Sequence, residues 1–245
     1  MKKTLCYFML AIMVSAQATG QELSLSPKNN PSNMDLLESE ISKMSWFMIK
    51  DTTEVKIGEI HTEIKKDEDR ILITTTVLME QSTNKWVDST IVNAQNFKPV
   101  YHSSFNLQRD MILKFGDKIT GYYLDKQTSD KKVISIETNR SFFDSNFYPQ
   151  LIRLLPLEDG YSKTISIFDY NPKSNIGVIS ATIHSTEKTT LTYNKKPKQV
   201  WKVETTDDIS NNTAISTYYI EISSRKIIKQ VVDFGGRKMI MRSIE

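Results

Sequence analysis

The sequence from Arg70 to Phe105 reads RILITTTVLM EQSTN KWVDSTIVN AQNFK PVYHSSF. Three runs rich in Ile, Val and Thr, which favour a pleated and half-buried surface, are separated by two short connections of five residues each. Connections of this length are too short for the crossovers that parallel strands require. The stretch therefore predicts three antiparallel strands, at Arg70–Met79, Lys85–Asn93 and Pro99–Phe105.

The same rhythm of short apolar-alternating runs extends over most of the chain. Gly235-Gly236 separates the last two runs and is typical of a two-residue hairpin turn. The other predicted strands are 46–48, 55–64, 111–115, 119–124, 132–138, 163–168, 176–185, 189–193, 199–206, 213–222, 226–234 and 237–244. The pattern predicts a mainly β protein, of the α+β kind, with an antiparallel sheet.

One segment breaks the rhythm, between Phe142 and Tyr161. Asp144 or Ser145 is placed to cap a helix there, and Pro156 would end it. The apolar residues at helical spacing are Phe147, Leu151, Leu154 and Leu155. A helix that is apolar on most of its surface has to be covered widely. The helix at 147–155 therefore either packs in the core or, as a plug, lines a cavity together with Phe143.

The N-terminal residues 1–18 have the pattern of a signal peptide. Lys2 and Lys3 precede ten apolar residues, and small residues follow near Ala16 and Ala18. Residues 19–33 are polar and predict a flexible leader. Residues 34–44 have a possible cap and an apolar face, which predicts a short helix. Residues 34–245 are expected to form a single curled β-sheet domain, with possible halves at 45–140 and 161–245 around the central helix.

Composition limits the kind of protein that this chain can be. Cys6, the one cysteine, lies in the signal segment, so we expect the mature chain to have neither disulfides nor thiolate metal sites. The net charge of +3 falls to +1 without Lys2 and Lys3, with 30 basic against 29 acidic residues. A nearly neutral chain argues against nucleic-acid binding. No later segment has the length of a transmembrane helix.

Two short stretches suggest an internal duplication. IGEIHTEI at 57–64 parallels IGVISATI at 176–183, and four of the eight positions are identical. In both, the apolar alternation slips at the glycine, which predicts a β-bulge or a sharp strand bend at Gly58 and at Gly177. NFKPV at 96–100 and SRKII at 224–228 occupy similar places between strands. Two β repeats within one sheet are therefore a hypothesis.

No catalytic or metal-binding pattern stands out. His61, His102 and His184 fall on three different predicted strands, and no HxH or HExxH spacing is present. The best pair is His61 and Glu63, on one face of one strand. There is no GxSxG motif and no glycine-rich phosphate loop. We therefore expect a protein that is not an enzyme and has no cofactor.

Three motifs carry a resemblance to a known family. They are FFDS at 142–145, LPLEDG at 155–160 and TYYIEISSRKI at 217–227. Over residues 45–245 the chain resembles an uncharacterised family of exported bacterial proteins of the domain-of-unknown-function kind. That family is similar in turn to the periplasmic lipoprotein carrier and acceptor (LolA/LolB-like) superfamily. The resemblance implies a sheet curled into an incomplete barrel around one helix, with an apolar concavity able to take acyl chains.

These observations lead to one functional hypothesis and one alternative. Several predicted strands are apolar on both faces, as with Ile71 and Ile73 on one side and Leu72 on the other. We expect a periplasmic or cell-envelope protein of a Gram-negative bacterium that binds a lipid or other apolar ligand in a half-barrel cavity. The candidate lining is Phe143, Phe147, Leu151, Leu154 and Leu155. The alternative is an interaction or scaffold module of the cell envelope with a packed interior, whose partner is an envelope protein.

Overall fold

The computed structural model describes residues 23–244, so the predicted signal peptide lies outside the described residues. Within them, fifteen strands form one sheet. The strands are β1 (Glu40–Lys50), β2 (Thr53–Lys66), β3 (Arg70–Met79), β4 (Lys85–Asn93), β5 (Pro99–Phe105), β6 (Arg109–Phe115), β7 (Lys118–Asp125), β8 (Asp130–Glu137), β9 (Phe143–Asp144), β10 (Lys163–Tyr170), β11 (Ile176–Tyr193), β12 (Lys196–Asp207), β13 (Ile215–Glu221), β14 (Ile227–Phe234) and β15 (Arg237–Ile244). The helical segments are η1 (Met34–Leu36), α1 (Tyr148–Leu154) and η2 (Asp208–Ser210).

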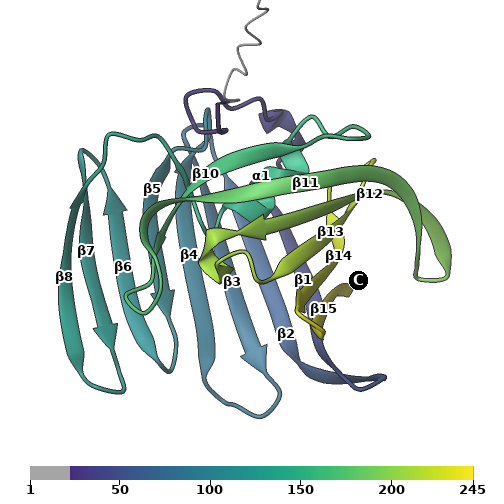
Figure 1. Cartoon of the computed structure of the whole chain (residues 1–245), viewed down its shortest axis with the longest axis horizontal. Coiled ribbons are helices and arrows are strands. Elements are labelled where there is room, and N and C mark those ends of the chain that lie inside the picture. Colours follow the sequence, from purple (N-terminus) through teal and green to yellow (C-terminus); the bar gives the residue numbers. More distant parts are fainter. Residues whose placement is uncertain (1–22, 245) are drawn as a thin grey trace, which may run out of the picture.

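The sheet consists of two series of antiparallel hairpins joined at one seam. Strands β1 to β8 follow one another in space, as do β10 to β15, and β1 pairs with β15. The short strand β9 adds to β10 in parallel at one end, and β8 forms the other end, so the sheet does not close into a barrel. In Figure 1 the sheet curls so that β10, β11 and β12 cross in front of the first series, with α1 between.

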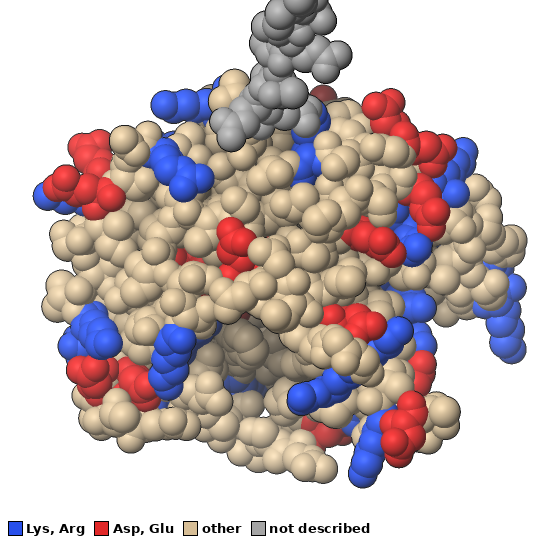
Figure 2. All heavy atoms as spheres, in the orientation of Figure 1, with Lys and Arg blue, Asp and Glu red and all other residues tan. Residues whose placement is uncertain are grey.

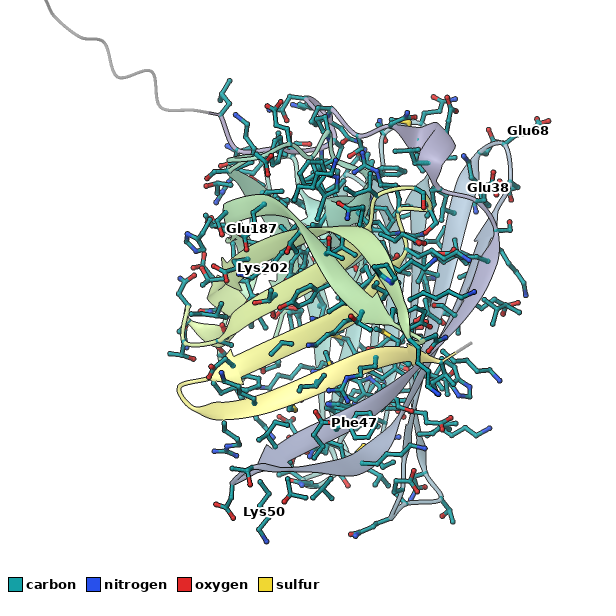
Figure 3. All side chains as sticks on the ribbon, turned by 90° about the vertical axis from the view of Figure 1, so that its right-hand side faces the viewer. Glu38, Phe47, Lys50, Glu68, Glu187 and Lys202 are labelled. Carbon is teal, nitrogen blue, oxygen red and sulfur yellow. The ribbon has the colours of Figure 1, made fainter. Side chains whose placement is uncertain are left out.

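The concave side of the curl holds the core. Side chains from α1, from β3 and β4, and from β10 to β13 form one cluster of buried apolar residues. Outward-facing positions carry charge, as where Glu187 on β11 lies beside Lys202 on β12, with Nζ 3.0 Å from Oε1 (Figure 3). A sheet with one covered and one solvated face shows this division. The predicted helix at 147–155 is confirmed as α1 at the centre of the fold.

The sequence prediction of a helix at 34–44 is wrong. Residues Met34–Leu36 form one turn of 3-10 helix, and Glu40–Lys50 is the strand β1. This strand pairs with β2 along its whole length and with β15 from Lys43 to Met48. Pairing on both sides supplies hydrogen bonds for the backbone of β1 that a surface helix would have to make internally, and this context outweighs the weak helix propensity of the segment.

The part of the predicted flexible leader that the structure describes is docked on the sheet. Leu25 is buried, its N–H donates to Thr164 O at 2.8 Å, and its carbonyl accepts from Ser166 N at 2.9 Å. Asn30 Nδ2 donates to Asn96 O at 3.3 Å. The prediction of a flexible leader is therefore wrong for residues 23–33. A polar and proline-containing composition does not prevent docking when one apolar side chain, here Leu25, is buried against the sheet.

Of the two predicted β-bulges, one is confirmed. Trp46 faces Gly58 and Phe47 faces Lys56, so Ile57 is the extra residue. A side chain at Gly58 would place its Cβ 2.4 Å from Leu78 O, which explains the glycine. At Gly177 the pairing with β10 is regular, so there is no bulge at this glycine.

Strand β11 differs from the prediction in another way. It is one strand of eighteen residues where two were expected, with its irregularity between Ile183 and Ser185. Its hairpin with β12 extends beyond the rest of the sheet in Figure 1. The pairing with β12 continues across the polar residues that separated the two predicted strands, and this pairing keeps the backbone extended.

Candidate functional site

The five residues predicted to line a cavity lie in the packed core. Phe143, Phe147, Leu151, Leu154 and Leu155 are all completely buried and belong to one apolar cluster. The ring centroid of Phe147 is 4.9 Å from that of Phe97. The described cavities lie elsewhere and contain none of the five residues in their lining.

A cavity of about 420 Å³ lies outside this apolar cluster, at turns between strands. It is formed where the β3–β4, β5–β6 and β10–β11 turns approach one another, and we call it the hairpin-tip pocket. Figure 2 shows a hollow below the middle of the face in view, with Lys or Arg side chains on both sides of it. The residues of this pocket that bear on its chemistry are Met79, Trp86, Leu107, Arg109, Tyr123 and Lys173.

The pocket has an exposed apolar border. Met79, Trp86 and Leu107 are 39%, 37% and 60% exposed, and each lines the pocket. Single exposed apolar side chains are ordinary on protein surfaces, but several around one concave site indicate a binding surface. Met79 ends β3, Trp86 lies near the start of β4 and Leu107 lies in the β5–β6 turn, so three separate segments supply this border.

Basic side chains adjoin the apolar border. Lys173 Nζ lies 2.9 Å from Asp125 Oδ2, and this ion pair lowers the pKa of Asp125. The Arg109 guanidinium donates to Ser104 Oγ at 3.2 and 3.3 Å. Lys85 also lines the pocket. The site thus combines an apolar rim with cations, an arrangement that suits an amphiphile with an anionic end.

Behind the pocket lies a network of buried polar side chains. At the exposed border of the pocket, Trp86 Nε1 donates to Asp88 Oδ1 at 2.7 Å. Deeper in the fold, His102 Nδ1 lies 2.8 Å from Asp144 Oδ2, and Thr90 Oγ1 donates to Asp144 Oδ1 at 3.2 Å. Both His102 and Asp144 are buried. A buried charged group is costly unless it has a partner, and His102 and Asp144 are partners for each other.

The network changes the acidity of its members. Burial alone would lower the pKa of His102, but the charge and hydrogen bond of Asp144 outweigh it, and the pKa is raised. Burial raises the pKa of Asp169, against a hydrogen bond from Ser145 Oγ that lowers it. The His102–Asp144 pair joins β5 to the segment that leads into α1.

A second buried network lies on the other side of α1. Tyr148 Oη donates to Asp207 Oδ2 at 2.5 Å. Burial, with the neighbouring Tyr218 and Asp207, raises the pKa of Tyr148 well above its ordinary value. Arg153, which is also buried, places Nη2 2.6 Å from Glu40 Oε1. The helix is thus apolar toward the core and is also held by polar links to β12 and β1.

The histidines are placed differently from the sequence interpretation. His61 Nε2 lies 3.1 Å from Glu59 Oε2, while Glu63 pairs with Lys65. Sequence reasoning missed the link between His102 and Asp144, because 42 positions separate these residues and Asp144 was interpreted as a helix cap. Helix α1 has no side-chain cap. One signal was available, since a histidine in an apolar strand needs a partner when it is buried.

Across 23–244, no three His, Cys, Asp or Glu side chains gather in a way that could hold a metal ion. In the same residues no helix has the length and apolarity needed to cross a membrane.

Comparison with known proteins identifies the family. No curated protein matches the chain. A family model described as Protein of unknown function (DUF3108) matches residues 43–242, which is most of the chain and includes the hairpin-tip pocket, the His102–Asp144 pair and α1. The chain therefore belongs to the DUF3108 family.

Proposed function

We propose that this protein is a non-enzymatic binding protein for a lipid or other amphiphile with an apolar chain, and that the ligand occupies the hairpin-tip pocket. The observation that carries the proposal is the gathering of Met79, Trp86 and Leu107 at the border of one cavity of about 420 Å³. Cavities of this volume are within the range of small-molecule sites. Burying apolar chain stabilises a complex by about 0.8 kcal/mol per methylene.

The proposal moves the ligand away from the site expected from the sequence. The residues around α1 are packed against one another, whereas the pocket opens at the tips of three hairpins. Arg109, Lys85 and Lys173 would face the polar end of the ligand, and Tyr123 and Val77 would contact its chain. The likeness to lipoprotein carriers, which suggested an acyl ligand, supports the same chemistry in this proposal.

We also propose that the protein acts outside the cytoplasm, in the periplasm or cell envelope of a Gram-negative bacterium. The support is the pattern of residues 1–18, with two lysines before ten apolar residues and small residues after them. An oxidising compartment would suit a mature chain that has no cysteine. Detection of the chain in a periplasmic fraction, with a new N-terminus near residue 19, would test this part of the proposal.

The second candidate function is a scaffold module of the cell envelope. The complete burial of the helix residues in a packed cluster favours it, because this half of the fold has no space for a ligand at α1. The two candidates differ in their prediction for the hairpin-tip pocket. A scaffold would leave the pocket without a bound lipid, and an envelope protein would be recovered with the chain after cross-linking.

The test is titration of the purified protein with cis-parinaric acid, a fluorescent fatty acid. We expect saturable binding that is weakened about tenfold or more by Leu107→Asp, because a carboxylate at the apolar border opposes both the chain and the anionic end. The matched control is Val133→Asp, at a side chain that is 83% exposed on β8 and outside the pocket. Native mass spectrometry of protein from its own host would identify the bound molecule.

Two results would overturn the proposal. One is the absence of fatty-acid binding by the unaltered protein, together with no lipid on protein isolated from its host. The other is equal binding by the Leu107→Asp and Val133→Asp variants, which would place the fatty acid outside the hairpin-tip pocket.

A further inference from the structure

A second cavity, of about 340 Å³, lies at the opposite end of the same strands. Strand β6 begins at Arg109, in the hairpin-tip pocket, and ends at Phe115, which lines the second cavity. Seven residues of strand span about 20 Å, so the two cavities are separate sites. We call the second one the basic pocket, for its lining by Lys28, Lys98 and Arg140.

We infer that the basic pocket binds an organic anion, with its phosphate, sulfate or carboxylate group on Lys28, Lys98 and Arg140 and its apolar part on Phe115 and Phe142. The inference does not depend on the proposed function of the hairpin-tip pocket, because it concerns other residues at another place in the fold.

The charged residues that line the pocket are all basic. No Asp or Glu is among its lining residues. Among residues 23–244, neither Lys28 nor Lys98 has an ion-pair partner, and the Arg140 guanidinium donates one hydrogen bond, from Nη1 to Val178 O at 3.1 Å. Asp117 and Glu137 line a neighbouring depression. A concave site that is lined by cations and by no acidic side chain concentrates anions.

The cations differ in this respect from others on the same protein. Lys173 in the hairpin-tip pocket is paired with Asp125, and Lys202 on β12 is paired with Glu187 on β11. Other lysines, such as Lys43 and Lys50 on β1, also have no ion-pair partner among the described residues, and Lys28, Lys98 and Arg140 differ from them because they line one cavity. The charge of this group is available to a ligand.

The floor of the pocket is apolar and rigid. Ile119 is buried, and Phe142 is almost completely buried. The ring of Phe142 packs between those of Phe115 and Phe168, with centroid distances of 5.8 and 5.2 Å. Such a floor offers contact to an apolar or aromatic body, which distinguishes the site from one for a small inorganic ion.

The docked segment before η1 completes the pocket. Pro27 and Lys28 belong to residues 23–33, which the bridge of Leu25 to β10 holds in place. Asn30 Nδ2 donates to Asn96 O in the β4–β5 turn, two residues before Lys98. This contact joins the segment that carries Lys28 to the turn that carries Lys98, so the two cations are brought to one site before any ligand arrives.

The test is isothermal titration calorimetry of the purified protein with phenyl phosphate. We expect binding that weakens as salt is added and a dissociation constant that rises at least tenfold in the double variant Lys28→Ala/Lys98→Ala. Both lysines are exposed, so the variant should fold as the unaltered protein does. Inorganic phosphate should bind more weakly than phenyl phosphate, since it has no group to place on Phe115 and Phe142.

The matched control is the double variant Lys43→Ala/Lys50→Ala, which removes the same charge from two exposed lysines of β1. Lys50 lies at the lower end of the molecule in Figure 3. The control should bind phenyl phosphate as the unaltered protein does. Equal loss in the two double variants, or no binding of phenyl phosphate by the unaltered protein at millimolar concentration, would overturn the inference.

The two sources of such an anion are distinguished by vesicles. Flotation with phosphatidylglycerol vesicles that depends on Lys28 and Lys98, with none on phosphatidylcholine vesicles, would identify a lipid headgroup as the anion. Calorimetric binding of phenyl phosphate without vesicle binding would identify a free organic anion. Either result supports the site, and vesicle binding that is unchanged in the Lys28→Ala/Lys98→Ala variant contradicts the lipid source.

Discussion

The β4–β5 turn and the β13–β14 turn lie in different halves of the sheet and have the same backbone geometry. In the first turn, Asn93 N donates to Lys98 O at 2.9 Å, and Phe97 N donates to Asn93 O at 2.9 Å. Phe97 has a φ of 62°. Its side chain is completely buried and packs on Phe147, at the start of α1.

The β13–β14 turn repeats these features with a different side chain. Glu221 N donates to Lys226 O at 2.8 Å, Arg225 N donates to Glu221 O at 2.8 Å, and Arg225 has a φ of 57°. Arg225 Nη1 donates to Leu155 O at 3.3 Å, and Arg153 Nη1 donates to Arg225 O at 3.4 Å. This turn therefore contacts the other end of α1.

The difference between the turns follows from the two ends of the helix. The start of α1 presents the ring of Phe147, which needs an apolar partner. The end of a helix presents carbonyl groups without partners, which need hydrogen-bond donors and favour a cation. One turn geometry thus serves both ends, and the residue in the left-handed position supplies the required chemistry. The likeness of the turns agrees with the duplication hypothesis, which stays a hypothesis.

The largest expected effect is from Phe97→Ala. Removal of a completely buried aromatic ring should lower the free energy of unfolding by about 3–5 kcal/mol, measured by urea unfolding. The control in the other half is Phe234→Ala, at a side chain that is 42% exposed, and it should cost much less. Similar losses in the two variants would show that Phe97 is not the apolar support of α1.

The next largest difference is expected between alanine substitutions at Gly58 and Gly177, the glycines of the two similar stretches, in the free energy of unfolding. Gly58→Ala places a Cβ against Leu78 O and should cost about 1–3 kcal/mol. At Gly177 no atom lies within 4 Å of an added Cβ, and its φ of 119° is then the only obstacle, at about 1 kcal/mol. Unfolding curves of the two variants should keep this order. A larger loss at Gly177 would contradict the close approach of Gly58 to the backbone of Leu78.

A smaller effect separates Arg225→Gly from Arg225→Ala. Both lose the hydrogen bond to Leu155 O, but glycine adopts positive φ without strain. The Gly variant should therefore be more stable than the Ala variant by about 1 kcal/mol, by thermal or urea unfolding. If alanine were equally stable, the left-handed geometry of this turn would not be required by the fold.

The last prediction concerns pH and the ion pair that joins the first half to the α1 segment. The pKa of His102 is raised in the folded state, so its contribution to stability is present below pH 6.5 and is lost as pH rises through the folded pKa. The carboxylates that act on His102 are Asp144, Asp88 and Asp169. The difference in unfolding free energy between the unaltered protein and His102→Gln should shrink as pH rises. A difference that is constant between pH 5 and pH 9 would contradict the ion pair.

Much of the sheet was predictable from the sequence. The strands Arg70–Met79, Lys85–Asn93, Pro99–Phe105 and Arg237–Ile244 have the predicted bounds, and the Gly235-Gly236 turn has positive φ at both glycines. Little of the candidate site was predictable. The hairpin-tip pocket collects residues from turns that are far apart in the sequence, and no local pattern marks Leu107 or Lys173 as neighbours.

What the sequence determined by itself is the content of strands, the antiparallel hairpins and the apolar helix at the centre, because alternation, turn residues and helical spacing act over fewer than about ten neighbouring positions. What only the tertiary structure decided is the identity of β1, the docking of residues 23–33, the pairing of His102 with Asp144 and the position of both pockets. Each of these depends on partners distant in the chain, and the free energy of such contacts is gained only when the curled sheet brings them together.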